Sequence, residues 1–580
     1  MPSALASFGW VLSTGSLVGA MLPTSWQQNT TINWQPCPSD LTKLAELPIT
    51  CAELIVPLDY IDTSNNATHT VELLKVEATK GPSLGSIIYN WGGPGAEGLV
   101  NMATTTAFYM KQSGGRHNLI SFNARGTSSK YLRFTCFENE SQRRRSQQNL
   151  LKTFDASDTA LGELWADGAI LADTCRKNAQ EIGPYIGTAS TARDVMQIVD
   201  ALNDGPLLNY YGPSYGTVLG ATLVAMFPER VGSVVIDGVL NPHEFNKALI
   251  NTEYGAAADA AFSEFFERCV KASPELCPLN QHGITAPELE AKIWEFIESI
   301  KHHPIALPAD FHDFDAWFLG TKVDYSGLHN AITITLYHPL NFGLMASALQ
   351  GMLEGDFANL TAWRNWYSSF LPGVAQAESL QGIFCADRVP RAVSVDQLIP
   401  EIKKSSSISR LVGQDWLNTM TTTPCAQWPF EAKGRYLGDF KAKTKNPVLL
   451  VGNTFDNVTP LASARNVSSG FEGSILLERR AFGVSIAFEN TANTYLQYLF
   501  SIPRSLSRPS ARTISSLIIM RKRVFPSATL FVMLTKTPSS LPSDIKRDNR
   551  GLREPSRARA NFIISEEPHE LENCWHMLGL

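Results

Sequence analysis

Beyond its first 25 residues, the sequence lacks any apolar run of the roughly 18 residues that a membrane-spanning helix needs. We therefore expect no stable membrane span. The sequence also lacks an excess of basic residues, since 49 Lys and Arg stand against 55 Asp and Glu and the net charge is −6. Binding of nucleic acid needs positive charge gathered to face the phosphates. The composition therefore argues against a nucleic-acid partner and is typical of a globular protein.

The nine cysteines lack the short spacings that are typical of zinc sites, so we expect no metal ion. Eight of them lie in sequence-local couples, which suits disulfides formed in an oxidising compartment, although spacing alone leaves their connectivity open. The couples are Cys37 with Cys51, Cys136 with Cys175, Cys269 with Cys277, and Cys385 with Cys425. The ninth, Cys574, lies near the end of the chain.

The first 25 residues are small and apolar and resemble a signal peptide, although the usual basic start is missing. A disordered or membrane-grazing N-terminus is the alternative. Several asparagines begin an N-x-S/T pattern, the acceptor signal for N-linked glycans in secreted proteins. They include Asn29, Asn66, Asn139, Asn359 and Asn466. With the cysteine couples, these features predict a secreted, extracellular protein.

The stretch Leu207–Gly220 reads LLNYYGPSYGTVLG and carries the clearest functional pattern. An apolar run, a turn with Ser214 at its tip and a helix-compatible run predict a strand, a sharp turn and a helix. The flanking glycines leave room for a strained turn that lifts the serine hydroxyl above a sheet, where it can act as a nucleophile. Taken alone, the pattern G-x-S-x-G also fits an ordinary strand-to-helix loop.

Short apolar runs that alternate with helical spacing predict a mostly parallel sheet covered by helices on both faces. The expected strands are Glu53–Leu58, Thr70–Val76, Gly85–Tyr89, Asn118–Phe122, Val231–Val239, Pro447–Val451 and Ser474–Leu477. A glycine-rich segment, 92–98, follows the third strand. Its backbone N–H groups can stabilise the oxyanion of an acyl-transfer reaction. A phosphate cradle is the alternative, but the Lys-Ser/Thr ending of a P-loop is missing.

Between residues 242 and 428 the strand runs stop and helical segments dominate, which predicts a helical cap inserted between two sheet strands. Its expected helices are Ala256–Val270, Pro287–Ile300, Leu328–Leu336, Asn341–Leu353 and Asp356–Tyr367. Dense aromatic residues in the cap favour a packed core over a substrate-binding box. They include Trp317, Tyr337, Phe342, Trp363, Trp366, Tyr367 and Phe370. Asp387 is a candidate to bind a substrate amine, although a surface salt bridge is favoured for it.

Asp456 follows the strand after the cap, where a catalytic acid lies in the chain order serine, acid, histidine. Its place between two expected strands favours a catalytic role over helix or turn capping. The other acidic candidate, Asp237, lies at the end of the strand Val231–Val239. A structural hydrogen bond is expected for that residue.

Six motifs occur in one order and together resemble the α/β-hydrolase family of prolyl and tripeptidyl aminopeptidases, with its C-terminal module. They are GGPG at Gly92–Gly95, FNARGT at Phe122–Thr127, YYGPSYGT at Tyr210–Thr217, IDGV at Ile236–Val239, CAD at Cys385–Asp387 and VGNTFDNVTP at Val451–Pro460. The resemblance spans about residues 51–483. It implies that Ser214 is the nucleophile and Asp456 the acid, and that the N–H groups of Gly93 and Tyr215 form the oxyanion hole. It also implies a reaction without metal or cofactor.

The sequence departs from this family at the catalytic histidine. The family places it directly after an aromatic-glycine pair, but here Phe482-Gly483 is followed by Val484. The next histidines are His569 and His576. A serine that has lost its base loses on the order of 10⁶ in turnover. Three explanations stay open: an inactive relative, a tail histidine that folds back, or an altered C-terminus.

We favour an altered C-terminus, because residues 484–580 are rich in Ser, Pro and Arg and have no sustained period. The codons of Val484-Ser485-Ile486 can form an intron donor, and those of Phe500-Ser501 can supply its end. Joining the message there would place a histidine codon after Gly483. Peptides from residues 501–580 in the mature protein would contradict this interpretation.

We therefore expect a signal peptide at 1–25, a hydrolase core at 45–241 and 436–483, a helical cap at 242–435 and an aberrant, disordered tail at 484–580. The predicted function is a secreted serine hydrolase that cleaves short peptides from their N-terminus through an acyl-enzyme. The alternatives are an esterase or lactonase that acts on a small-molecule ester, and a catalytically impaired hydrolase-like protein.

Overall fold

The computed structural model describes residues 32–281, 283–314, 316, 318–370, 374–483, 530–534 and 560–564. Within these ranges, no helix is long and apolar enough to cross a membrane. The expected signal peptide and most of the expected tail lie outside them. Two segments of that tail, at 530–534 and 560–564, are strands.

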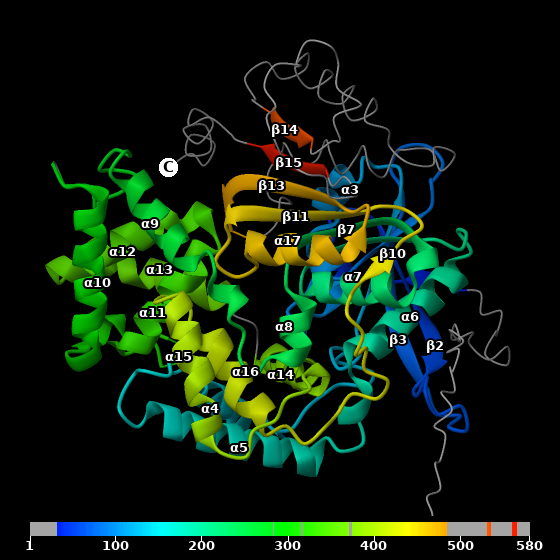
Figure 1. Cartoon of the computed structure of the whole chain (residues 1–580), viewed down its shortest axis with the longest axis horizontal. Coiled ribbons are helices and arrows are strands. Elements are labelled where there is room, and N and C mark those ends of the chain that lie inside the picture. Colours follow the sequence, from blue (N-terminus) through cyan, green and yellow to red (C-terminus); the bar gives the residue numbers. More distant parts are fainter. Residues whose placement is uncertain are drawn as a thin grey trace, which may run out of the picture.

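An eleven-stranded sheet forms the centre of the molecule, and its strands run in the order β1-β2-β3-β5-β4-β6-β7-β11-β13-β15-β14 (Figure 1). From β5 to β15 neighbouring strands are parallel, whereas β1, β2, β3 and β14 pair antiparallel. The bounds in sheet order are Gln35–Pro36, Ile49–Pro57, Thr68–Val76, Asn118–Phe122, Ser86–Tyr89, Leu208–Ser214, Val231–Val239, Val448–Phe455, Ile475–Phe482, Ala560–Ile564 and Leu530–Leu534. The seven strands expected from the sequence are all present, and the mostly parallel sheet is confirmed.

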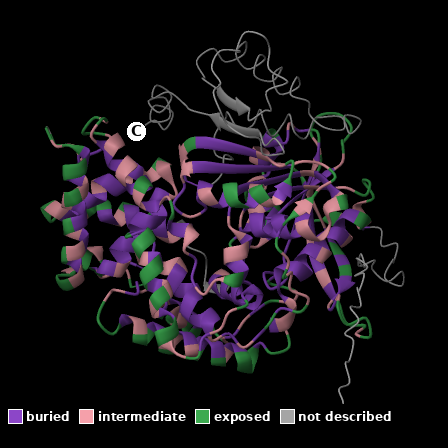
Figure 2. Ribbon diagram, viewed as in Figure 1, coloured by how far each residue is buried: buried purple, intermediate pink, exposed green. Residues whose placement is uncertain are grey.

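Alternating side chains place the sheet between two apolar layers, because successive residues of a strand point to opposite faces. Ile88 and Tyr210 pack with helices α6, α7 and α17, whereas Ile87 and Tyr211 pack with α2 and α3. Figure 2 shows the strands buried and the outer helix faces exposed. The helices of the core are α1 Ser39–Leu44, α2 Gly98–Thr104, α3 Thr106–Gln112, α6 Thr188–Leu202, α7 Tyr215–Met226 and α17 Leu461–Gly470.

A helical cap is inserted between β7 and β11, as the sequence predicts. Its helices form the lobe to the left of and below the sheet in Figure 1. They are α8 Pro242–Lys247, α9 Ala258–Cys269, α10 Ala286–His302, α11 Tyr325–Leu336, α12 Phe342–Glu354, α13 Ala358–Phe370, α14 Val374–Asp387, α15 Ile399–Ile408 and α16 Trp416–Ala426. Two-stranded ribbons join β8 Ile305–Ala306 to β9 Lys322–Val323, and β10 Ala442–Lys443 to β12 Phe471–Glu472.

The cap contains a second segment that the sequence assigned to the core. Helices α4, Glu140–Asn149, and α5, Ala160–Asn178, precede β6 in the chain but lie beside α14 and α16 (Figure 1). Leu150 and Leu171 share one apolar cluster with Cys385 and Met420. The expected division at residue 242 is therefore too simple, because the cap is built from two insertions.

Four disulfides join the cysteine couples identified in the sequence: Cys37–Cys51, Cys136–Cys175, Cys269–Cys277 and Cys385–Cys425. Three of them lie in the cap and its α4–α5 segment. Cross-links of this kind stabilise a fold mainly by restricting the unfolded chain.

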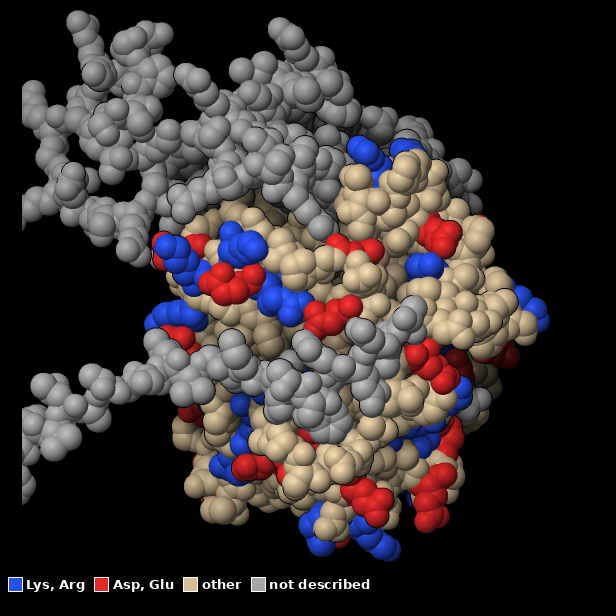
Figure 3. Space-filling view, turned by 90° about the vertical axis from the view of Figure 1, so that its right-hand side faces the viewer, with Lys and Arg blue, Asp and Glu red and all other residues tan. Residues whose placement is uncertain are grey.

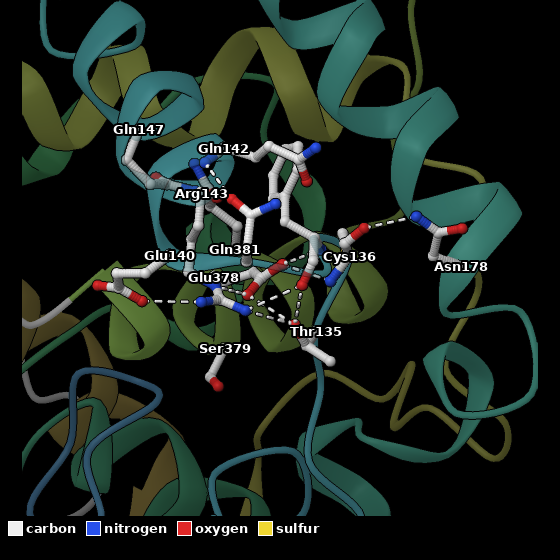
Figure 4. A network of polar contacts seen from close by, with 12 residues as sticks. Thr135, Cys136, Glu140, Gln142, Arg143, Gln147, Asn178, Glu378, Ser379 and Gln381 are labelled. Atoms are coloured by element: carbon white, nitrogen blue, oxygen red, sulfur yellow. Dashed lines mark hydrogen bonds and ion pairs between the residues drawn. The ribbon is translucent and has the colours of Figure 1, made fainter.

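A buried ion pair ties the two cap segments together (Figure 4). Arg143 of α4 donates from Nε to Glu378 of α14 at 2.6 Å, and the side chains are 8% and 1% exposed. Glu378 also accepts hydrogen bonds from the backbone N–H groups of Cys136 and Phe137. Arg143 forms a second ion pair with Glu140, whose side chain is 60% exposed. These contacts satisfy a carboxylate that would otherwise be costly to bury.

Acidic and basic side chains are interspersed on the face shown in Figure 3, and they do not separate into single-sign patches there. Among the described residues, exposed charges form ion pairs such as Lys130 with Glu53 and Arg410 with Glu298.

We expect Glu378→Ala to lower the free energy of unfolding by about 3–5 kcal/mol, because it leaves a buried guanidinium without its main partner. The matched control is Glu140→Ala, which removes the exposed partner of the same arginine and should cost less than about 1 kcal/mol. Urea unfolding followed by circular dichroism measures both. Equal losses in the two variants would contradict the role assigned to Glu378.

Candidate active site

Ser214 lies at a strained turn between β6 and α7, as the strand-turn-helix pattern predicts. It ends the strand and precedes the first residue of the helix, with φ 55° and ψ −126°. A side chain seldom adopts positive φ, and such strain is typical of functional positions. Ser214 is half-buried, whereas its neighbours Pro213 and Tyr215 are buried. The turn therefore presents the serine at the end of the parallel strands.

The glycine-rich loop after β4 packs directly on this turn. A Cβ on Gly92 would lie 2.9 Å from the backbone nitrogen of Tyr215, and a Cβ on Gly216 would lie 2.3 Å from the carbonyl oxygen of Asn90. Only glycine allows both approaches. Gly93 follows at the same loop and is exposed. The loop therefore lies beside the turn that carries Tyr215. That the N–H groups of Gly93 and Tyr215 form an oxyanion hole stays a prediction from the family resemblance.

Asp456 directly follows β11, two strands from β6 in the sheet. It is fully buried and accepts hydrogen bonds from the N–H of Val458 at 3.0 Å, from the N–H of Thr459 at 2.7 Å and from the Thr459 hydroxyl at 2.5 Å. Burial raises the pKa of Asp456, and these hydrogen bonds oppose the rise. The carboxylate is held by its own loop at the edge of the sheet where Ser214 lies.

Ser214 has side-chain partners in the core and in the cap: the Thr217 hydroxyl donates to its carbonyl oxygen at 2.6 Å, and a tyrosine of the cap lies near its hydroxyl. Tyr337, which follows the last residue of α11, forms a side-chain hydrogen bond with Ser214. Burial and the nearby Asp456 raise the pKa of Tyr337 above its ordinary value, and the hydrogen bond that its oxygen accepts from Ser214 opposes the rise. The sequence placed this aromatic residue in the cap core, as it did Trp363 and Tyr367. Those two are buried, but Tyr337 is half-buried and lies near Ser214.

The position expected for the catalytic histidine, residue 484, lies outside the described residues, as do His569 and His576. The residue before it is placed: the N–H of Gly483 donates to Phe455 at 3.2 Å, and its carbonyl accepts from Asn453 at 2.7 Å. A Cβ on Gly483 would lie 2.5 Å from the carbonyl oxygen of Tyr337. The chain therefore leaves β13 beside the tyrosine that contacts Ser214.

Asp387 is buried, so the expected surface salt bridge is wrong. Both of its carboxylate oxygens accept a hydrogen bond from the N–H of Thr188 at 3.0 Å. The Thr188 hydroxyl in turn lies 2.6 Å from the hydroxyl of Tyr215. Asp387 therefore connects the end of α14 to the residue after the nucleophile. Burial raises its pKa to about 6, against the opposing hydrogen bonds from Thr188.

Asp237 is buried in β7 and accepts a hydrogen bond from the Tyr211 hydroxyl at 2.7 Å. The structural hydrogen bond expected from the sequence is confirmed. Among the described residues, no group of three or more His, Cys, Asp or Glu side chains is arranged to hold a metal ion.

The buried carboxyl of Asp387 should make stability depend on pH. Its pKa in the folded protein, about 6, lies above the value of about 4 expected for the unfolded chain, so the folded state binds more protons between these values. Stability then falls as pH rises through this window. Asp387→Asn removes this titrating group. Between pH 4 and pH 7, the melting temperature of the wild type should therefore fall by several degrees more than that of the variant.

Thermal unfolding at fixed ionic strength measures this difference, with the exposed Asp310→Asn as a control for loss of a surface charge. A difference between wild type and Asp387→Asn that stays constant with pH would contradict the prediction.

The fold and the placement of these residues define a class. The strand order, the serine turn between β6 and α7 and the acid after β11 are those of an α/β hydrolase, and residues 139–263 match the family model described as alpha/beta hydrolase fold. The protein has the α/β-hydrolase fold. Residues 409–499 match the model described as TAP-like protein, so this part of the chain is similar to the TAP-like family.

Curated relatives carry peptidase names. The chain is 25% identical to serine protease Hip1 of Mycobacterium tuberculosis over 77% of this chain and 84% of the relative. It is 24% identical to a tripeptidyl aminopeptidase of Streptomyces coelicolor over 82% of this chain and 86% of the relative. Solved structures include a homoserine O-acetyltransferase from Staphylococcus aureus, with 10% identity, 81% and 99% coverage and a TM-score of 0.34.

The TAP-like match runs through residue 499, whereas the sequence motifs suggested that the resemblance ends at Gly483. Residues 484–499 lie outside the described residues, so the interpretation of an altered C-terminus stays a hypothesis from the sequence.

Proposed function

We propose that this protein is a secreted serine hydrolase of the peptidase type, which releases short peptides from the N-terminus of its substrates through an acyl-enzyme. The observation that carries the proposal is the meeting of three elements at one edge of the sheet. They are the strained Ser214, the glycine-rich loop packed on it and the buried Asp456. The peptidase names of the relatives favour a peptide substrate over an ester.

The proposed reaction begins when the Ser214 oxygen attacks the carbonyl carbon of the scissile bond. The N–H groups of Gly93 and Tyr215 donate to the oxyanion of the tetrahedral intermediate. Collapse of the intermediate expels the amine and leaves the acyl group on Ser214, and water then releases it. Asp387 and Thr188 hold the Tyr215 ring, and with it the backbone that carries one of these donors.

A base must remove the Ser214 proton, and position 484 carries valine where the family has histidine. We therefore propose that the chain retains the nucleophile, the acid and the oxyanion donors but turns over slowly. A catalytically impaired hydrolase is thus the second candidate, and the valine is the observation that favours it.

Secretion is supported by the four disulfides, which form in oxidising compartments. Four asparagines of the glycosylation patterns named above lie in the described residues, and each is exposed: Asn66, Asn139, Asn359 and Asn466. Asn29 lies outside the described residues. A glycan on any of the four would extend into solvent.

Labelling with a fluorophosphonate tests whether Ser214 is a nucleophile. The wild type should be labelled slowly, and Ser214→Ala not at all. Ser233→Ala, a change at another half-buried sheet serine, should be labelled like the wild type. Fluorogenic tripeptide amides with a free amino group should be cleaved in preference to their N-acetylated forms. Hydrolysis of simple esters alone would instead identify an esterase or lactonase.

Restoring the missing base should raise activity. We expect Val484→His to increase kcat/KM by about 10²–10⁴, the usual contribution of general-base catalysis. The control is Val484→Ala, which changes the side chain but supplies no base. If the histidine variant matches the alanine variant while Ser214 is still labelled, the proton acceptor lies elsewhere in the protein.

A further inference from the structure

Three buried side chains connect the cap to the residue that follows Ser214. Asp387 ends the cap helix α14, Thr188 begins helix α6 of the core, and Tyr215 begins helix α7. Their exposed fractions are 5%, 4% and 2%. The three residues are distant in the sequence, so it is the fold that brings them together.

Asp387 acts as the N-terminal cap of helix α6. The N-cap residue of that helix is Gly187, which has no side chain to accept hydrogen bonds from the free N–H groups of the first turn. Both carboxylate oxygens of Asp387 accept instead from the N–H of Thr188, at 3.0 Å. A Cβ on Gly187 would lie 2.8 Å from one of these oxygens, so the glycine makes room for the carboxylate. The positive end of the helix dipole also favours a negative charge there.

Two hydrogen bonds link Tyr215 to Asp387 through Thr188, and their direction is fixed. The Thr188 hydroxyl donates to Asp387. Because that hydroxyl has a single proton, it accepts from the Tyr215 hydroxyl, which lies 2.6 Å away. The phenol therefore donates to the threonine, and the threonine donates to the carboxylate. We refer to these two hydrogen bonds as the Tyr215 anchor.

The Tyr215 anchor acts on the turn that carries Ser214. Tyr215 directly follows the serine, and its backbone nitrogen would lie 2.9 Å from a Cβ on Gly92 of the glycine-rich loop. Its ring packs on Phe245 of α8, with the ring centroids 5.8 Å apart. Holding the far end of the side chain restricts the backbone of the same residue. This matters because an oxyanion donor is effective when it is already aimed before the reaction.

We propose that Asp387 and Thr188 are positioning residues: through the Tyr215 anchor, they hold the backbone N–H of Tyr215 in the direction from which it donates to the oxyanion. The proposal rests on the function proposed above, which assigns that donor. The burial of Asp387 and the use of both its oxygens by Thr188 favour this role over the binding of a substrate amine. Because Asp387 ends a cap helix, the placement of the cap then affects the oxyanion donor.

The first experiment measures saturation kinetics of labelling by a fluorophosphonate. Tyr215→Phe removes the phenol hydroxyl, and Thr188→Val removes the threonine hydroxyl but keeps the N–H that bonds Asp387. Each should lower the maximal labelling rate about three- to tenfold, the range expected for one hydrogen bond, while the half-saturating concentration stays within about twofold. The double variant should be no slower than the slower single variant, because both changes break the same contact. Thr188→Ser keeps the hydroxyl and should label like the wild type.

The matched control is Tyr325→Phe, which removes another buried phenol hydroxyl, bonded to Asp155 in the cap at 3.0 Å. It should label like the wild type. Labelling of Tyr215→Phe and Thr188→Val at the rate of this control would overturn the proposal. So would a double variant in which the two single losses multiply.

A second readout does not depend on activity. With tyrosine carrying ¹³C at Cζ, Thr188→Val should shift the NMR signal of Tyr215, which Tyr215→Phe assigns, and should leave that of Tyr325 unchanged. An unshifted Tyr215 signal would overturn the Tyr215 anchor. A shifted signal with unchanged labelling would show a contact that is structural only, and would overturn the positioning role. A shifted signal in a wild-type protein that no fluorophosphonate labels would contradict the proposed hydrolase function, so the failures are distinguishable.

Discussion

The backbone strain at Ser214 is the constraint on which the rest of the site depends. A residue other than glycine adopts positive φ here only because its surroundings hold it there. The β6 strand on one side and helix α7 on the other provide that support, and Gly92 and Gly216 allow the neighbouring loop to close on the turn. A side chain at either glycine would force the glycine-rich loop away from Ser214.

The buried charges around the turn show how the cap and the core share one site. Asp387, at the end of a cap helix, is bonded through Thr188 to the ring of Tyr215. Tyr337, at the end of another cap helix, is bonded to Ser214 itself. The cap therefore contacts the turn at Ser214 from two directions and is more than a cover over the sheet.

Much of the fold could be predicted from the sequence because the patterns that indicate strands, turns and helices are local. The strands Asn118–Phe122 and Val231–Val239 lie where apolar runs and turn residues predict them, and helix α7 follows the serine turn as expected. The cysteine couples are joined as their spacing suggested. Asp456 was found by its place after a strand, and Asp237 by its place at the end of one.

The features that could not be predicted from the sequence depend on tertiary contacts between residues that are distant in the chain. The helix α4 is polar along most of its length, and nothing in its residues indicates that Arg143 pairs with Glu378, 235 positions away. Asp387 resembles a surface carboxylate because its partner, Thr188, is distant in the chain. Tyr337 has the composition of a core aromatic, and only the folded arrangement brings its hydroxyl to the serine. The signal that could have singled it out is its nearness to the end of a cap helix.

The two-part origin of the cap has a consequence for how such an enzyme can change its specificity. Helices α4 and α5 precede β6 in the sequence, and helices α8 to α16 follow β7. The two groups nevertheless share one apolar core and are joined by the Arg143–Glu378 ion pair. Transplanting only the longer insertion from a relative would leave half of that interior facing a foreign surface. A new lid for this scaffold would have to be exchanged as two pieces at once, so recombination at a single pair of crossover points is a poor route to a new substrate pocket.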